Sequence, residues 1–102
     1  MVSYNKLVRD NIPDMIRAQG ETPHIRILET EEYLRHLEAK LDEEVGEYHR
    51  DKNAEELADI LEVTYALTES LGYTQEDLLR TYHRKHAQRG GFRDRVFLIS
   101  KE

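Results

Sequence analysis

The sequence predicts an all-α fold in a single domain, residues 1–102, built around a hairpin of two long helices. Apolar side chains recur every three or four positions in residues 31–50, and residues 54–71 repeat this pattern. The link between these segments is so short that the second helix must return antiparallel to the first. A two-helix hairpin cannot cover its own apolar stripe, so we expect further copies, in a homodimer or homotetramer, to complete a four-helix bundle.

Boundary residues mark the segments before the hairpin. Asn11 and Pro13 predict the start of a short helix, because proline is accepted in a first turn, and Gly20 ends it. Thr30 is the expected N-cap of the first long helix, and the acidic residues after it suit the positive end of the helix dipole. A short helix and a connection therefore precede the hairpin.

The C-terminal third contains equally clear boundary signals. Gly72 is expected to stop the second long helix, and residues 74–77 (T-Q-E-D) form a capping-box pattern that starts a final helix. That helix is expected to end near Arg89, before two glycines. Residues 95–99 have the composition of a strand that could pair with residues 24–28, so we expect at most a small two-stranded sheet beside the helices.

Charge is distributed unevenly along the chain. The 21 acidic residues outnumber the 15 lysines and arginines, which gives a net charge of -6. Residues 29–62 hold 13 acids and 4 bases, whereas residues 80–95 hold 6 bases and 1 acid. An acidic chain is a poor non-specific ligand of nucleic acids. The two segments are either solvated helix faces of opposite sign or parts of a site for a metal ion and a polyanion.

Long apolar runs and cysteines are both missing from the sequence. No run approaches the ~20 apolar residues of a membrane span, and the first residues lack the apolar core of a signal peptide. Without cysteine, neither disulfide bonds nor thiolate metal ligands are available. We therefore expect a cytoplasmic protein with no membrane partner.

Four carboxylates occupy unusual positions on the two long helices. Glu44 and Glu47 are three residues apart on the first helix, and Glu56 and Asp59 repeat this spacing on the second. At about 100° per residue, Glu44 and Glu56 fall within the apolar stripes. Glu47 and Asp59 fall about 60° away, at the stripe edges. Because the hairpin is antiparallel, the two pairs are expected to face each other.

This carboxylate cluster (Glu44, Glu47, Glu56 and Asp59) predicts a metal site, because burying four negative charges together is very costly without cations. Carboxylates without histidine or thiolate favour Mg²⁺, with Mn²⁺ as a substitute. Alternatives exist for individual members: Glu56 could complete a capping box with Asn53, and Glu44 and Glu47 could be solvated acids. Two facing pairs beside apolar stripes favour the metal interpretation.

Four segments together resemble a known enzyme family. Residues 40–48 (K-L-D-E-E-V-G-E-Y) resemble the E-E-x-x-E element of the MazG-like, all-α nucleoside triphosphate pyrophosphohydrolases, and residues 55–62 resemble the E-x-x-D element that follows it. Phosphoribosyl-ATP pyrophosphohydrolases are a related branch. The opening residues 4–10 (Y-N-K-L-V-R-D) and the closing residues 89–92 (R-G-G-F) are similar to those of a small single-domain subgroup.

This resemblance implies Mg²⁺-dependent cleavage of a nucleotide between its α and β phosphates, which releases a monophosphate and pyrophosphate. It implies that the carboxylate cluster ligates the metal, that Glu44 takes part in catalysis, and that Glu43 is a further ligand or the base that orients water. Two alternatives stay open. One is hydrolysis of phosphoribosyl-ATP in histidine synthesis, and the other is a non-catalytic helical module that binds a nucleotide or a partner protein.

A basic, glycine-containing segment ends the last predicted helix. Lys85 and Arg89 share one helix face, and Gly90 and Gly91 allow backbone conformations that other residues avoid. Arginines and exposed amides could bind phosphate oxygens of the substrate there. The alternative is an ordinary helix end, with cations that suit the dipole and a glycine stop. The family resemblance favours phosphate binding.

Three further cations are candidates for substrate contact. Lys6 and Arg9 belong to the N-terminal segment, where basic residues are often simply solvated, and Lys40 begins the first acidic motif. His83 and His86 are three residues apart, but two histidines without a third ligand make a poor zinc site.

Overall fold

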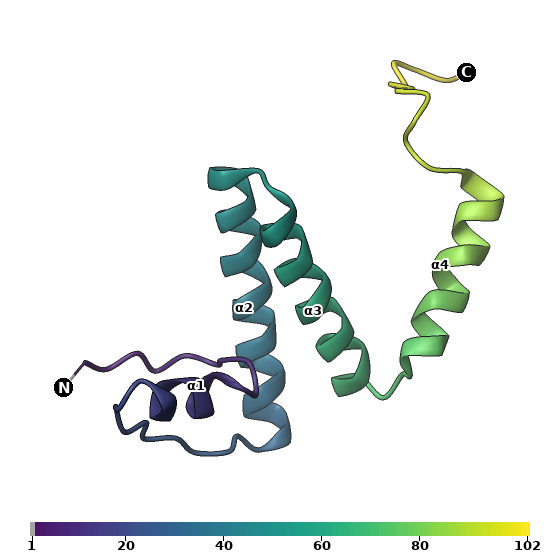
Figure 1. The fold of residues 1–102 in the computed structure, drawn as a ribbon. Helices are drawn as coiled ribbons and strands as arrows, with labels where there is room; N and C mark the ends of the chain where they lie inside the picture. The colour runs from purple at the N-terminus through teal and green to yellow at the C-terminus, as the bar shows by residue number, and fades with distance from the viewer. Residues whose placement is uncertain (1) are drawn as a thin grey trace.

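Four helices make up the regular structure of the chain. The computed structural model describes residues 2–102, and within them the elements follow in the order α1 (Ile12–Ala18), α2 (Thr30–Asp51), α3 (Ala54–Ser70) and α4 (Gln75–Arg89) (Figure 1). No strand occurs in this range. The expected all-α fold is therefore confirmed. None of the helices in this part of the chain is both long and apolar enough to cross a membrane.

The antiparallel pair α2 and α3 forms the centre of the fold (Figure 1). Leu37 and Val63 are its buried apolar side chains. At the link between the helices, Lys52 adopts a left-handed conformation (φ 48°) and its N–H donates to the Tyr48 carbonyl at 2.8 Å. The side chain of Asn53 then caps α3. This tight turn holds the C-terminal half of α2 against the N-terminal half of α3.

Helix α4 diverges from the hairpin (Figure 1). Its helix contacts within residues 2–102 are with α3, and α1 packs closely on no other helix. The predicted capping box is confirmed: the Thr74 hydroxyl accepts from the Asp77 N–H at 3.1 Å, and the Asp77 carboxylate accepts from the Thr74 N–H at 2.9 Å. The predicted end at Arg89 is also confirmed.

The small two-stranded sheet that was allowed for at most does not form, because residues 24–28 and 95–99 are not strands. Residues 24–28 lie in the connection before α2, and residues 95–99 extend from the far end of α4 (Figure 1). The apolar side chains of the second segment are solvent-exposed, with Ile99 89% exposed. Their composition favours strands only where a neighbouring strand completes the hydrogen-bond ladder, and the two segments do not meet.

The start of α2 also differs from expectation, because Glu29 and not Thr30 is the N-cap. The Glu29 carbonyl accepts from the Tyr33 N–H at 2.8 Å, so Thr30 already belongs to the first turn. Arg26 holds Glu32 through two hydrogen bonds of 2.9 and 2.6 Å, which fixes the approach of the chain to the helix. By contrast, the start of α1 after Asn11 is as predicted.

The chain as a whole is extended. Its radius of gyration is 18.0 Å, whereas a compact domain of this length has about 13 Å. Its accessible surface is 9483 Å², whereas a compact monomer of this mass exposes about 6,000 Å². Much of the excess lies in α4 and the residues after it, where nearly every side chain is exposed.

Candidate metal centre

The carboxylate cluster forms as the helical projection predicts. Glu44 and Glu47 on α2 meet Glu56 and Asp59 on α3, and one oxygen from each residue lies within 4.8 Å of the others. The short link and the antiparallel packing produce this convergence, because they align the two pairs across the hairpin. A single divalent ion could contact oxygens from both helices.

Glu44 is the most buried member of the carboxylate cluster, with only 6% of the residue exposed. Its Oε2 atom is buried and has no hydrogen-bond partner among the described residues, while its Oε1 atom lies 3.5 Å from the Lys40 ammonium. The Oε2 atom of Glu56 is also buried without a partner. Buried carboxylate oxygens are normally paired, so these orphaned atoms indicate that a proton or a cation is needed between the helices.

Proton affinities in the carboxylate cluster are perturbed in the direction that burial predicts. Burial raises the pKa of Glu44, and hydrogen bonding and repulsion from Glu47 raise it further, against a smaller opposing effect of Lys40. The pKa of Glu56 is raised by burial and then by Glu47. Both shifts arise because negative charge is concentrated where water cannot solvate it fully. A divalent cation would remove their cause.

Two cations from the N-terminal arm (residues 2–10) reach the rim of the carboxylate cluster. Arg9 donates to Asp59 Oδ1 at 2.5 Å and lies 3.9 Å from Glu62. Lys6 donates to Glu43 Oε1 at 2.8 Å. This contact raises the pKa of Lys6 and lowers that of Glu43. Glu43 thus lies beside the carboxylate cluster as an ionised neighbour and is not one of its four members.

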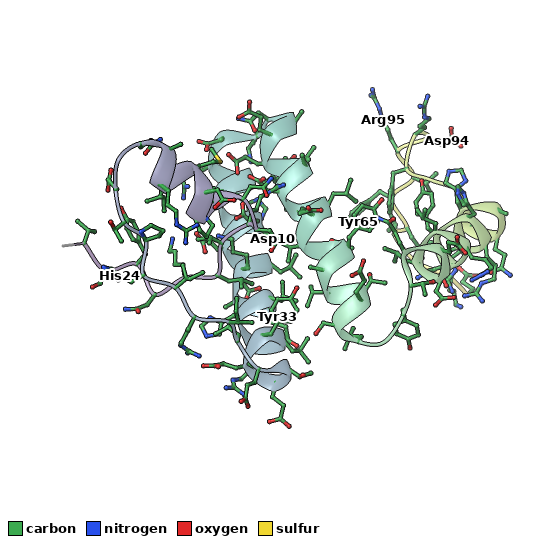
Figure 2. The ribbon with its side chains drawn as sticks, turned by 60° about the horizontal axis from the view of Figure 1, so that its bottom comes forward. Asp10, His24, Tyr33, Tyr65, Asp94 and Arg95 are labelled. Atoms are coloured by element: carbon green, nitrogen blue, oxygen red, sulfur yellow. The ribbon has the colours of Figure 1, made fainter. Side chains whose placement is uncertain are left out.

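A groove of about 410 Å³ runs from the carboxylate cluster along the hairpin. The N-terminal arm forms part of its wall, Glu44 and Asp59 line one part, and Tyr33 and Tyr65 contribute aromatic surface. Figure 2 shows Tyr33 on α2, with Asp10 of the arm beside the same helix. A second hollow, of about 620 Å³, lies at the start of α2 and contains no member of the carboxylate cluster.

Sequence reasoning did not identify this groove. Its wall depends on where the arm crosses the hairpin, and Arg9 pairs with a residue 50 positions away. The one available signal was the arm sequence itself, residues 4–10, which combines two cations with apolar residues that could rest on the helices.

The predicted phosphate-binding end of α4 is not brought to the carboxylate cluster within one chain. Lys85 and Arg89 are exposed near the C-terminal end of α4, and this helix contacts the hairpin through α3 only. Gly90 takes a positive φ of 77°, and its N–H donates to the carbonyl of His86 at 2.8 Å. Gly91 follows in an exposed, irregular segment. The phosphate-binding role of these residues stays a prediction.

Comparisons with known proteins leave the family open. No protein-family model matches the chain, and no solved structure matches it. A stretch of 42 residues is 62% identical to an uncharacterized protein of Mycolicibacterium smegmatis (strain ATCC 700084 / mc(2)155). That stretch covers 41% of this chain and 43% of the relative, so the chain spans less than half the length of the curated relative that it matches.

Proposed function

We propose that this protein is a Mg²⁺-dependent nucleoside triphosphate pyrophosphohydrolase that acts on cytoplasmic nucleotides, with Mn²⁺ as a substitute ion. The observation that carries the proposal is the buried, unpartnered Oε2 of Glu44, which belongs to a group of four carboxylates from two helices. The likeness of residues 40–48 and 55–62 to the MazG-like motifs gives this site its proposed reaction.

The donor set fits a hard divalent cation. Oxygens are the ligands that Mg²⁺ prefers, and the four members of the carboxylate cluster would hold it. When bound, Mg²⁺ would neutralise charge on phosphate oxygens and make a bound water more acidic. The combined negative charge of the four carboxylates favours an added cation, because Lys40 is the one described cation within ion-pair distance of Glu44, at 3.5 Å.

Glu43 is suited to orient the attacking water by accepting a hydrogen bond from it. Lys6 donates to it at 2.8 Å and lowers its pKa, so the carboxylate stays ionised at neutral pH. Lys40 lies 3.7 Å from the other oxygen of Glu43 and so holds the side chain at the edge of the carboxylate cluster. The carboxylate of Glu43 raises the pKa of Lys6, so Lys6 keeps its positive charge where the triphosphate would lie.

Arg9 is suited to a phosphate contact. Among residues 2–102, the Arg9 guanidinium is the one cation in ion-pair contact with Asp59. If Asp59 held a metal ion, the guanidinium would be free to contact a phosphate oxygen at the same rim, and its fork geometry matches that ligand. Lys6 and Arg9 would thus act as substrate-binding residues, as the sequence predicted.

The groove beside the carboxylate cluster provides room for the nucleoside. Its volume of about 410 Å³ lies in the range of small-molecule sites. Tyr33 and Tyr65 offer surfaces on which a base could stack. Burial raises the pKa of Tyr33, and the negative charges of Asp10 and Glu69 raise it further, so its hydroxyl stays protonated and able to donate a hydrogen bond.

A dimer completes the proposed enzyme. Helix α3 and its C-cap Leu71 carry a second stripe at alternating spacings of four and three residues, made of Leu57, Leu61, Thr64, Thr68 and Leu71, of which Thr68 is already buried. The two threonine hydroxyls donate to carbonyls of their own helix at 2.8 Å, which satisfies them there, while Leu57 and Leu61 are 52% and 51% exposed. This spacing is typical of helices that pack along a seam. Two copies joined along α3 would form the four-helix bundle, alone or within a tetramer.

Phosphorus NMR with a nucleotide panel tests the proposed reaction. The purified chain is mixed with Mg²⁺ and, separately, with common triphosphates, base-modified triphosphates and phosphoribosyl-ATP. We expect a pyrophosphate signal and the matching monophosphate from at least one triphosphate, and no signal without Mg²⁺. Release from phosphoribosyl-ATP alone would support the histidine-pathway alternative. A panel with no pyrophosphate at all would contradict the enzyme assignment and favour a non-catalytic nucleotide-binding or partner-binding module.

A further inference from the structure

The C-terminal segment (α4 together with residues 90–102) exposes apolar side chains that a solvated tail would not carry. Phe92 is 97% exposed and Phe97 is 87% exposed, and the residues around Phe97 are similarly uncovered. Tyr82 on α4 is also more than half exposed, and α4 buries no residue at all. A run of large apolar residues this exposed marks a binding surface.

This segment and the hairpin have complementary charges, but among the described helices of one chain α4 contacts α3 and not α2, and the basic C-terminal end of α4 diverges from the hairpin (Figure 1). Residues 80–95 hold 6 bases and 1 acid, whereas residues 29–62, which span α2 and half of α3, hold 13 acids and 4 bases. Figure 2 shows Asp94 and Arg95 beyond α4, on the opposite side of the molecule from Tyr33 on α2 and from Asp10 beside that helix. Surfaces of opposite sign attract, so the natural partner of the basic segment is an acidic hairpin.

The exposed area is large enough for an extensive contact with a second copy. The chain exposes 9483 Å², which exceeds the area of a compact monomer by roughly 3,500 Å². Obligate homodimers bury about 2,000–5,000 Å² in total, or half of that per subunit. A seam along α3 would use part of this excess. Exchange of an entire helix and tail between subunits would use the remainder.

We infer that the C-terminal segment docks on the hairpin of a second copy of this chain and carries Lys85 and Arg89 to the carboxylate cluster of that copy. A two-fold dimer then contains two composite sites, each with acids from one chain and C-terminal cations from the other. The exchange explains why α4 diverges from its own hairpin (Figure 1). The docking stands on exposure and charge alone, whereas the shared site rests on the proposed function.

Oligomeric state tests the docking without reference to activity. Light scattering of the full chain should give twice 12.1 kDa, or a multiple of that dimer. Because only the α3 seam would then hold the dimer, the double variant Phe97→Asp and Ile99→Asp should dissociate to monomers at a higher protein concentration than the wild type, while circular dichroism keeps the helical signal. The control Lys101→Asp changes charge just beyond the apolar run and should leave the assembly unchanged. A monomeric wild-type chain, or a double variant that assembles as the wild type does, would overturn the exchange.

Complementation tests the shared site. One chain carries Glu44→Gln, the other carries Lys85→Ala and Arg89→Ala, and differently tagged copies allow the heterodimer to be purified. Each homodimer should lose most pyrophosphate release, whereas the heterodimer contains one intact composite site of two and should recover about half of the wild-type rate. Sites built within one chain would give no recovery, which would overturn the inference, as would a fully active Lys85→Ala and Arg89→Ala homodimer. A wild-type chain without activity would instead contradict the proposed function, and the mass measurement would still decide the docking.

Discussion

The hairpin and the C-terminal segment are incomplete in opposite ways. In the hairpin, Leu37 and Val63 are buried between two paired helices, but the buried Oε2 atoms of Glu44 and Glu56 have no hydrogen-bond partner within residues 2–102. In the C-terminal segment, the cations Lys85 and Arg89 are exposed to solvent, but apolar side chains such as Phe97 are equally uncovered. The hairpin therefore needs positive charge and the C-terminal segment needs apolar contact. One assembly of two copies could provide both.

Removing the charge of Glu44 should have the largest effect. We expect Glu44→Gln to lower pyrophosphate release on the order of a thousandfold, about 4 kcal/mol of activation free energy, because the buried oxygen that would ligate the metal becomes a neutral amide. The variant Glu55→Gln makes the same chemical change at an exposed position of α3, outside the carboxylate cluster. Steady-state assays of pyrophosphate release by both variants with Mg²⁺ measure the difference between the buried and the exposed position. An equal loss of activity in both variants, or no loss in either, would contradict the role of Glu44.

Arg9→Ala should have effects of intermediate size, strengthening metal binding and weakening substrate binding. The guanidinium holds Asp59 while no metal is bound, so its removal should tighten Mn²⁺ binding by up to about fivefold; the pair is half exposed and the gain is limited. The KM for a triphosphate should rise about tenfold, since a phosphate contact is lost. Calorimetry with Mn²⁺ measures the effect on metal affinity, and steady-state kinetics measure the effect on the KM. Arg17→Ala, which removes an arginine paired with Asp14 on α1, should leave the Mn²⁺ affinity unchanged. An equal change of metal affinity in both variants would contradict the role of Arg9.

A smaller effect is expected in the pH dependence of stability. Glu44 has a folded-state pKa above its ordinary value of 4.5. Its contribution to the stability of the metal-free chain therefore falls as the pH rises from that value through the raised pKa. Glu44→Gln should be more stable than wild type on the order of 1 kcal/mol at neutral pH. This difference in stability should disappear below pH 4.5, where Glu44 is protonated in both the folded and the unfolded state.

Denaturant unfolding at a series of pH values measures this gap. The ion pair of Lys6 with Glu43 has the opposite pH dependence, because the pKa of Glu43 is lowered. It is present in wild type and variant alike, so it cancels in the difference. Added Mg²⁺ should stabilise wild type and not the variant. A gap that stays constant with pH would show that Glu44 is not strained by its neighbours.

Local signals predicted the helices well. The Thr74 capping box and the end of α4 at Arg89 depend on residues within a few positions of each other, and both are confirmed. The convergence of the carboxylate cluster was also predictable, because a link of two residues leaves only one antiparallel register for Glu44 and Asp59. Periodicity and turn length are thus enough for the hairpin and its acids.

Long-range contacts were not predictable from the sequence. The pairing of Arg9 with Asp59 joins residues 50 positions apart, and nothing local in either segment indicates it. The expected strand at residues 95–99 failed for a related reason. The apolar composition of this segment indicates that it packs against another surface. Whether that surface is a strand or a helix depends on the partner, which the segment itself does not encode.

The two-residue link between α2 and α3 also affects the order of folding. Closing so short a loop is fast, so the hairpin is expected to form before Arg9 and Lys6 arrive from distant positions in the chain. The four carboxylates then approach one another in an early intermediate, where their repulsion raises the barrier to hairpin formation. Divalent cations in the refolding medium are therefore expected to accelerate folding as well as to stabilise its product.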